Sequence, residues 1–216
     1  MIGCFCRVEP LDVDRHARDL HNANALDADG RNWTYLPYGP FATFDAYLEW
    51  VGGAAASDDP FFHAIVDVAT ERAVGVASYL RIDPPAGSIE VGHIAYSPLL
   101  QRKPAGTEAM YLMMKRAFEL GYRRYEWKCD SLNLASREAA ERYGLSYEGV
   151  FRQARVNKGL NRDTAWYAAI DAEWPALDRA FRQWLDASNF DANGQQRTPL
   201  RALTRTILVR SHEDEG

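Results

Sequence analysis

The segment at residues 101–107 constrains the fold most, because a short basic loop there joins an extended apolar run to an amphipathic helix. The run before it, residues 89–96, is rich in β-branched and apolar side chains, which is typical of a strand. Apolar residues recur at helical spacing after Thr107. They are Met110, Met113, Ala117 and Leu120. A helix N-terminus favours phosphate through its unpaired N–H groups and its dipole, and Arg102 and Lys103 add positive charge. The pattern therefore predicts an anion site, although an ordinary strand-to-helix turn produces it more often.

A second strand-to-helix junction follows, where residues 124–129 predict a strand and residues 133–143 a short helix that ends at Gly144. Four residues of this helix share one face. They are Asn133, Ser136, Ala140 and Tyr143. One interpretation is structural, with Asn133 as the helix cap and Tyr143 as a half-buried anchor whose hydroxyl bonds a carbonyl. The other interpretation is that the two junctions form the two sides of one cofactor groove.

The rest of the pattern predicts a mixed α/β sheet in one domain, without internal repeats. Strands are expected at residues 4–9, 61–68, 73–82, 89–96, 124–129, 148–156 and 164–170. Helices are expected at residues 15–25, 43–51, 133–143 and 174–187, and after Thr107. We assign residues 1–187 to the domain and residues 188–216 to a C-terminal extension that is partly flexible, above all at its charged end, residues 211–216. Within the extension, residues 206–209 fit an added strand and a partner contact equally well.

Composition fits a soluble globular protein and excludes several classes of partner. The 216 residues are 47% hydrophobic and 25% charged, and the formal net charge is -5, with no block of Lys and Arg that would suit nucleic acid. No apolar run reaches the roughly 20 residues that span a bilayer, and no signal peptide is recognisable, so we expect a cytoplasmic protein without membrane contact. The three cysteines, Cys4, Cys6 and Cys129, lack the spacing of a disulfide framework or a zinc site, so we expect no metal.

The motifs together resemble the GNAT superfamily of acyl-CoA-dependent N-acyltransferases over roughly residues 7–186. Within it, they are similar to the Rim-type branch of ribosomal-protein N-terminal acetyltransferases. The loop QRKPAG at residues 101–106 matches the first and last positions of the family motif Q/R-x-x-G-x-G/A. The N-x-x-S pattern at residues 133–136, the Tyr-Gly-Leu segment at residues 143–145, and residues 147–149 and 161–163 also fit the family. The resemblance implies a single-domain GNAT fold, a mixed, mostly antiparallel twisted sheet with helices on both faces, and acetyl-CoA as the cosubstrate.

The resemblance also implies which residues bind acetyl-CoA. They are Ile94, Tyr96, Gln101, Arg102, Lys103, Ala105, Gly106, Thr107, Asn133 and Ser136. For Ile94 and Tyr96 the implied contact is made by the backbone, which pairs with the pantetheine amides as an added strand does. Pro104 departs from the motif, because it replaces the middle glycine and has no N–H to donate. We expect the neighbouring cations and amides to compensate, since proline also pre-orders the loop, and a reduced cofactor affinity is the alternative.

The implied chemistry is acetyl transfer to a primary amine by direct attack, which needs a base for the amine and a proton for the departing thiolate. Glu90 is our candidate for the base, directly or through water, because it lies eleven residues before Gln101, as does the glutamate of the histone-acetylating members. A solvent-facing strand position is the alternative for Glu90. His93 also titrates near neutral pH, but we expect it on the opposite face as a packing residue. Tyr143 occupies the place of the family tyrosine that protonates the thiolate.

The acceptor is less well defined by the sequence. The family builds its acceptor site from the first helices and the late strands, which implies Trp33, Tyr38, Trp127 and Arg152 as substrate-binding residues. These fit a small amine or a protein N-terminus, and the aromatic residues fit the core as well. A homodimer is left open. A non-catalytic acyl-CoA-binding or regulatory module on the same fold is the alternative function, with the lost loop glycine as its main support.

Overall fold

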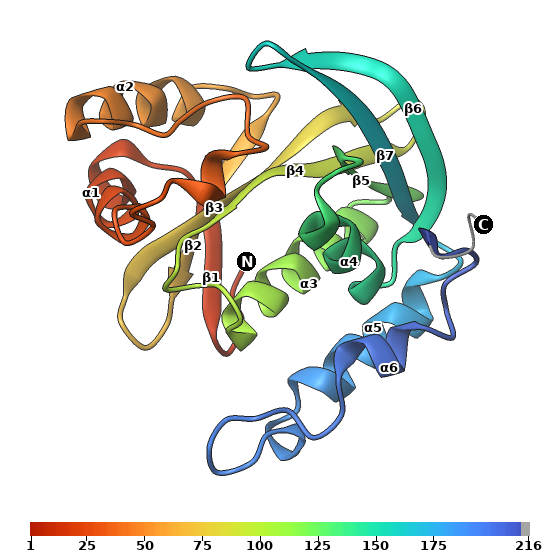
Figure 1. The fold of residues 1–216 in the computed structure, drawn as a ribbon. Helices are drawn as coiled ribbons and strands as arrows, with labels where there is room; N and C mark the ends of the chain where they lie inside the picture. The colour runs from red at the N-terminus through yellow and green to blue at the C-terminus, as the bar shows by residue number, and fades with distance from the viewer. Residues whose placement is uncertain (213–216) are drawn as a thin grey trace. The chain divides into compact units, whose positions relative to one another are not determined.

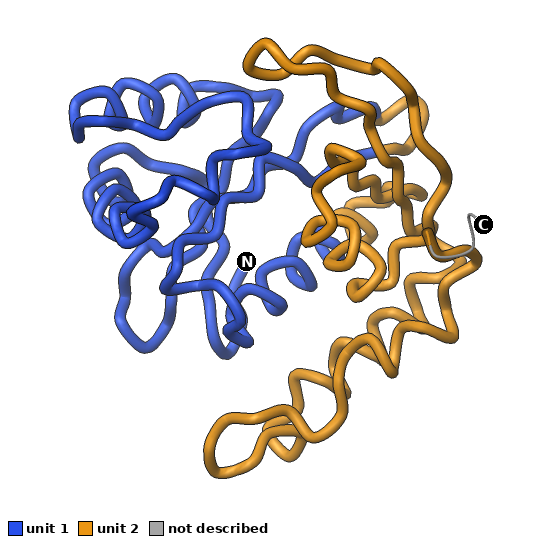
Figure 2. Tube along the Cα trace, viewed as in Figure 1, with its two compact units in different colours: residues 1–83, 89–116 blue, residues 84–88, 117–216 orange. Residues whose placement is uncertain are grey.

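The computed structural model describes residues 1–212, which form two compact units. The first unit contains residues 1–83 and 89–116, and the second contains residues 84–88 and the chain from residue 117 onward (Figure 2). Within residues 1–212, no helix is both long enough and apolar enough to cross a membrane.

The first unit is built on four strands in the order β1-β2-β3-β4. Their bounds are β1 (Cys6–Pro10), β2 (Phe61–Asp67), β3 (Arg72–Asp83) and β4 (Ser88–Tyr96). β1 pairs antiparallel with β2, and β2 pairs antiparallel with β3 with a register shift after Ile65. β2 and β3 are buried over most of their length, so both of their faces belong to the core.

Four helical segments belong to the first unit. They are α1 (Val13–Asn24), the 3₁₀ helix η1 (Arg31–Trp33), α2 (Phe44–Ala55) and most of α3 (Pro104–Glu119). The Asp12 and Thr43 side chains cap α1 and α2 by accepting from backbone N–H groups three residues on. α1 packs against β3 and α2 (Figure 1), and the core between these helices and the strands is aromatic, with Trp33, Tyr47 and Phe62 among its buried members.

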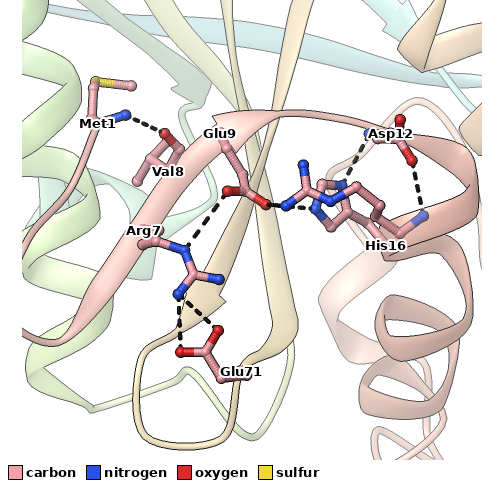
Figure 3. A network of polar contacts seen from close by, with 8 residues as sticks. Met1, Arg7, Val8, Glu9, Asp12, His16 and Glu71 are labelled. Carbon is pink, nitrogen blue, oxygen red and sulfur yellow. Dashed lines mark hydrogen bonds and ion pairs between the residues drawn. The ribbon is translucent and has the colours of Figure 1, made fainter.

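A polar network ties β1 to α1 (Figure 3). The Asp12 backbone N–H donates to Nδ1 of His16, so the ring proton is on Nε2, which donates to the Glu9 carboxylate at 2.9 Å. Arg15 and Arg7 also contact Glu9, at 2.5 and 3.7 Å. Burial raises the pKa of Glu9, but the His16 hydrogen bond and the two arginine charges outweigh it, and the pKa lies below its usual value.

A second buried carboxylate joins α3 to the start of the chain. Glu108 is 3% exposed and accepts hydrogen bonds from three consecutive backbone N–H groups. The donors are Cys4 at 2.7 Å, Phe5 at 2.6 Å and Cys6 at 2.9 Å. A Cβ at Gly3 would lie 2.3 Å from the Glu108 carboxyl carbon, so the chain needs a glycine there to approach the carboxylate. Glu108 is therefore a structural residue that anchors the N-terminal segment to α3.

The second unit carries three strands in the order β5-β7-β6, both pairs antiparallel. The strands are β5 (Arg124–Asp130), β6 (Ser146–Asn157) and β7 (Leu160–Ile170). The helices are α4 (Leu134–Arg142), α5 (Trp174–Leu185), the 3₁₀ helix η2 (Ala187–Asn189) and α6 (Leu200–Thr204). β6 and β7 form one long hairpin with two register shifts, and α6 packs beside α5 (Figure 1).

The predicted strands and helices are all present, and the predicted α/β class is confirmed. Three details differ. The third α-helix begins at Pro104, three residues before Thr107, because proline suits the first position of a helix. The two late strands are longer than predicted: β6 ends at Asn157 and β7 begins at Leu160, so that they form a hairpin. Residues 206–209 form no strand in the structure. The predicted flexible end at residues 211–216 lies mostly outside the described residues. Its two described residues, Ser211 and His212, are both hydrogen-bonded.

Candidate active site

The loop before α3 presents two cationic side chains to solvent, as expected for the predicted anion site. The side chains of Arg102 and Lys103 are exposed, and Arg102 adopts a left-handed φ of 57° that turns the chain into the helix. Pro104 is the first helical residue, where an N–H has no partner within the helix in any case. The Gly106 N–H donates to the Lys103 carbonyl at 3.2 Å. The two side-chain cations and the dipole of a 16-residue helix therefore carry most of the attraction for an anion here.

Gly106 is required by the close approach of an aromatic ring. A Cβ on Gly106 would lie 2.9 Å from Cε2 of Tyr96, and the Tyr96 hydroxyl donates to the Gly106 carbonyl at 2.7 Å. The glycine at the last position of the loop motif thus lets the Tyr96 ring pin the first turn of α3.

The carbonyl of Tyr96 is the centre of a three-residue junction. It accepts from Asn32 Nδ2 at 3.1 Å and from Gln101 Nε2 at 2.9 Å, and Gln101 Nε2 also contacts Asn32 Oδ1 at 2.7 Å. A carbonyl has two lone pairs, so this one is already saturated. Gln101, predicted as a cofactor ligand, holds the loop against η1, and a ligand amide would have to displace one of the two donors. No local pattern pointed to Asn32, which lies 64 residues before Tyr96.

Glu90 lies inside the first unit rather than on its surface. It is 3% exposed, and its Oε2 contacts Arg81 Nη1 at 2.5 Å. Arg81 has a left-handed φ of 47°, and the backbone N–H groups of Arg81 and Ile82 both donate to the Asp59 carboxylate. The solvent-facing alternative for Glu90 is therefore wrong. Arg81, which sequence reasoning missed, fixes the position of this carboxylate.

His93 contacts aromatic residues. Its ring stacks on Tyr38 with centroids 5.6 Å apart and lies 5.1 Å from Phe62, and Nδ1 is 3.3 Å from the Tyr38 hydroxyl. Burial raises the pKa of Tyr38, so its hydroxyl stays protonated. Trp33 is buried in the core, and Tyr38 is half-buried against Trp50 and His93. His93 is thus the packing residue that we expected.

In the second unit, the residues of the predicted polar stripe form one packed cluster. Asn133 caps α4 by accepting from the Ser136 N–H at 3.1 Å, which confirms the structural interpretation of Asn133. The Trp127 indole N–H donates to Ser136 Oγ at 3.0 Å, and its ring lies 5.9 Å from that of Tyr143. Arg152 is exposed on β6, whereas Trp127 is buried.

Tyr143 is 4% exposed and is held on two sides by rings. It stacks on Phe181 with centroids 6.2 Å apart, in addition to its contact with Trp127. Its hydroxyl accepts from Arg142 Nη2 at 3.2 Å. A cation therefore stands directly beside the hydroxyl that we expect to donate a proton.

The cysteines of the chain are free thiols, and two are buried. Burial raises the pKa of Cys129 to about 11 and raises that of Cys6 as well, so neither thiol is ionised near neutral pH. Neither can therefore act as a thiolate nucleophile. Residues 1–212 contain no group of three or more His, Cys, Asp or Glu side chains that could hold a metal ion.

Residues 7–146 match the family model described as acetyltransferase (GNAT) domain, so this chain belongs to the GNAT acetyltransferase family. A solved GCN5-related N-acetyltransferase from Brucella melitensis is 44% identical, with a TM-score of 0.92 over 94% of this chain and 93% of that one. A probable GNAT acetyltransferase from Chromobacterium violaceum is 42% identical, with a TM-score of 0.76 over 81% and 87%. The predicted GNAT fold is thereby confirmed, and the family supports an acyltransferase.

A more distant structure bears on the predicted branch. The Salmonella typhimurium acetyltransferase that modifies the N-terminal serine of ribosomal protein L7/L12 is 21% identical, with a TM-score of 0.65 over 78% of this chain and 96% of that one. At this identity the likeness shows the fold alone. No curated protein matches the sequence.

Proposed function

We propose that this protein transfers the acetyl group of acetyl-CoA to a primary amine by direct attack of the amine on the thioester. The observation that carries the proposal is the loop before α3. It places two exposed cations, Arg102 and Lys103, at the N-terminus of a 16-residue helix, inside the segment that matches the family model. This arrangement suits the pyrophosphate of coenzyme A.

Two residues are assigned to proton transfer. Glu90 takes the proton of the attacking amine, directly or through water, and Arg81 holds its carboxylate in place. Tyr143 gives a proton to the coenzyme A thiolate. The adjacent Arg142 guanidinium stabilises the negative charge that develops on the Tyr143 oxygen. Burial raises the pKa of the Cys6 and Cys129 thiols, so neither of these two is available near neutral pH as the nucleophile of an acyl-enzyme.

The acceptor and the branch belong to the same proposal. We place the protein in the Rim-type branch on the motifs at residues 101–106 and 133–136. The acceptor is then a small amine or a protein N-terminus. Of the four residues predicted to bind it, Tyr38 and Arg152 are not buried, whereas Trp33 and Trp127 are buried.

The non-catalytic alternative rests on the missing N–H of Pro104. The structure places Pro104 at the first position of α3, which proline favours, so the helix forms normally although this position offers no N–H to an anion. Glu90 and Tyr143 are both present and buried, so we favour the enzyme.

The test is thiol release from acetyl-CoA over a panel of amines, amino acids and N-terminal peptides. We expect release with at least one acceptor, and a kcat about 100-fold lower for Tyr143→Phe, since a general acid contributes about 10²–10⁴. The KM for acetyl-CoA should stay within about twofold, because only the hydroxyl is removed. Tyr122→Phe, at a half-buried tyrosine of the same unit, is the matched control. Binding of coenzyme A without thiol release in the presence of any acceptor would favour the non-catalytic module. An undiminished kcat for Tyr143→Phe would make Tyr143 an anchor only.

A further inference from the structure

We propose that the C-terminal segment at residues 200–212, here called the strap, positions Tyr143, and that Glu141 and His212 are its main anchors. The inference rests on the proposed role of Tyr143 as proton donor. The strap lies outside residues 7–146, the part of the chain that matches the family model. It belongs to the same compact unit as α4 and Tyr143.

The first contact is a buried carboxylate that receives its hydrogen bonds from the strap. Glu141, in the last turn of α4, is 1% exposed. It accepts from Ser211 Oγ at 3.0 Å, from the His212 backbone N–H at 2.7 Å and from His212 Nδ1 at 2.5 Å. A buried carboxylate without donors is strongly unfavourable, so Glu141 and the strap hold each other in place.

The second contact closes the end of the helix. The last carbonyls of a helix have no partner within it. The Thr204 hydroxyl, on α6, shares its one proton between the Arg142 carbonyl at 3.1 Å and the Leu200 carbonyl at 3.2 Å, and the Thr204 side chain is fully buried. Gly144, with a φ of 84°, packs so tightly that a Cβ there would lie 2.3 Å from Leu177 Cδ2 and 3.4 Å from Thr204 Cβ.

The third contact fixes the chain after Tyr143. The Val209 N–H donates to Ser146 Oγ at 2.9 Å, and the Tyr147 N–H donates to the Arg210 carbonyl at 3.0 Å. Backbone atoms are therefore tied to the strap one residue before Tyr143, at the Arg142 carbonyl, and four residues after it, at the Tyr147 N–H. Because the Tyr143 ring is itself packed between Trp127 and Phe181, a shift of this backbone moves the hydroxyl with it.

This geometry predicts a kinetic effect that passes through the tyrosine hydroxyl. A displacement of about 1 Å at a reacting group can cost about 100-fold in rate. We expect Glu141→Gln and His212→Ala to lower kcat about tenfold or more, with the KM for acetyl-CoA within about twofold of the parent value. Glu138→Gln, at an exposed glutamate of the same helix, should leave kcat unchanged.

The decisive measurement repeats Glu141→Gln and His212→Ala in a Tyr143→Phe background. If the strap acts through the hydroxyl, each substitution should change kcat less than twofold there, because the group that it positions is already absent. An equal loss of kcat in both backgrounds would mean that the strap only stabilises the fold, and an unchanged kcat in the parent background would mean that it positions nothing. Either result overturns the inference.

Hydrogen exchange gives a readout that does not depend on activity. Two truncations are compared, one that ends at Arg210 and removes Ser211 and His212, and one that ends at His212 and keeps both residues. Amides of residues 139–147 should exchange at least tenfold faster in the shorter chain, while β5 should exchange equally in both. If the full chain releases no thiol, or if Tyr143→Phe is fully active, the proposed function of Tyr143 fails, and exchange alone then decides whether the strap holds this turn. Equal exchange in the two truncations would overturn the inference.

Discussion

Glu108→Gln tests how far one buried carboxylate holds the first unit together. Glu108 Oε2 accepts from the N–H groups of Phe5 and Cys6, and Oε1 accepts from that of Cys4. Glutamine has almost the same shape but only one carbonyl oxygen. That oxygen can keep the two bonds to Phe5 and Cys6, and the amide nitrogen then faces the N–H of Cys4, donor against donor.

The expected loss of stability follows from this count. One hydrogen bond to a charged group is lost, which is about 1.5–3 kcal/mol, and a donor in a part-buried position is left without an acceptor, which adds about 1 kcal/mol. The two surviving bonds become neutral and weaker. Because Glu108 is 3% exposed, solvent screening removes little of this cost. We therefore expect the free energy of unfolding to fall by about 3 kcal/mol.

Urea denaturation of the parent and of Glu108→Gln measures this difference directly. Glu49→Gln, at an exposed helical glutamate of the same unit, should change the free energy of unfolding by less than about 0.5 kcal/mol. Hydrogen exchange should show faster exchange at Cys4 in the Glu108 variant. A loss below about 1 kcal/mol would refute the reasoning, because it would mean that the carboxylate is not needed to satisfy these backbone groups.

Two further predictions concern the loop glycine and a buried histidine. Gly106→Ala should weaken acetyl-CoA binding about tenfold in calorimetry, about 1.4 kcal/mol, because the new Cβ displaces the Tyr96 ring that pins α3, whereas Gly53→Ala, at a glycine with open space, should not. An unchanged affinity for Gly106→Ala would contradict the role given to this close approach. Burial lowers the pKa of His63 to about 4, so the unfolded chain takes up a proton below about pH 6.5 while the native state does not. The free energy of unfolding should therefore fall by about 2 kcal/mol between pH 7 and pH 5 and continue to fall towards pH 4. In urea denaturation at each pH, His63→Gln should lack this contribution to the pH dependence. An equal pH dependence of the free energy of unfolding in both proteins would exclude His63 as its source.

Local sequence patterns were enough to predict the seven strands and the helices α1 to α5, but not the short helix α6 or the two 3₁₀ helices. Strands such as residues 61–68 are apolar runs bounded by turn residues, and the helix at residues 133–143 carries both a cap and a terminating glycine. The start of α3 was misplaced because the motif comparison treated residues 104–106 as loop. Pro104 itself was the missed signal, since proline is common at the first position of a helix.

The partners of the candidate site could not be predicted from the sequence. Glu90 was singled out by its position before the loop. Its ion pair with Arg81 depends on the left-handed backbone at Arg81, and a residue other than glycine gives no sequence signal for that conformation. The junction of Asn32 with Gln101 joins residues 69 apart and likewise has no local signature. Local patterns therefore indicated the candidate segments, and tertiary contacts determine how each side chain is held.

The strap also has a consequence for solubility. β6 is the outermost strand of its unit, and an outer strand has unpaired peptide groups that can recruit a strand from another molecule and start aggregation. The Arg210 carbonyl occupies the Tyr147 N–H at the beginning of this edge. Farther along, the register shifts distort the edge, and the exposed cations Arg152 and Arg155 charge it. The strap, which contacts the last turn of α4, thus also occupies the beginning of the β6 edge and makes this end of the strand less available to another molecule.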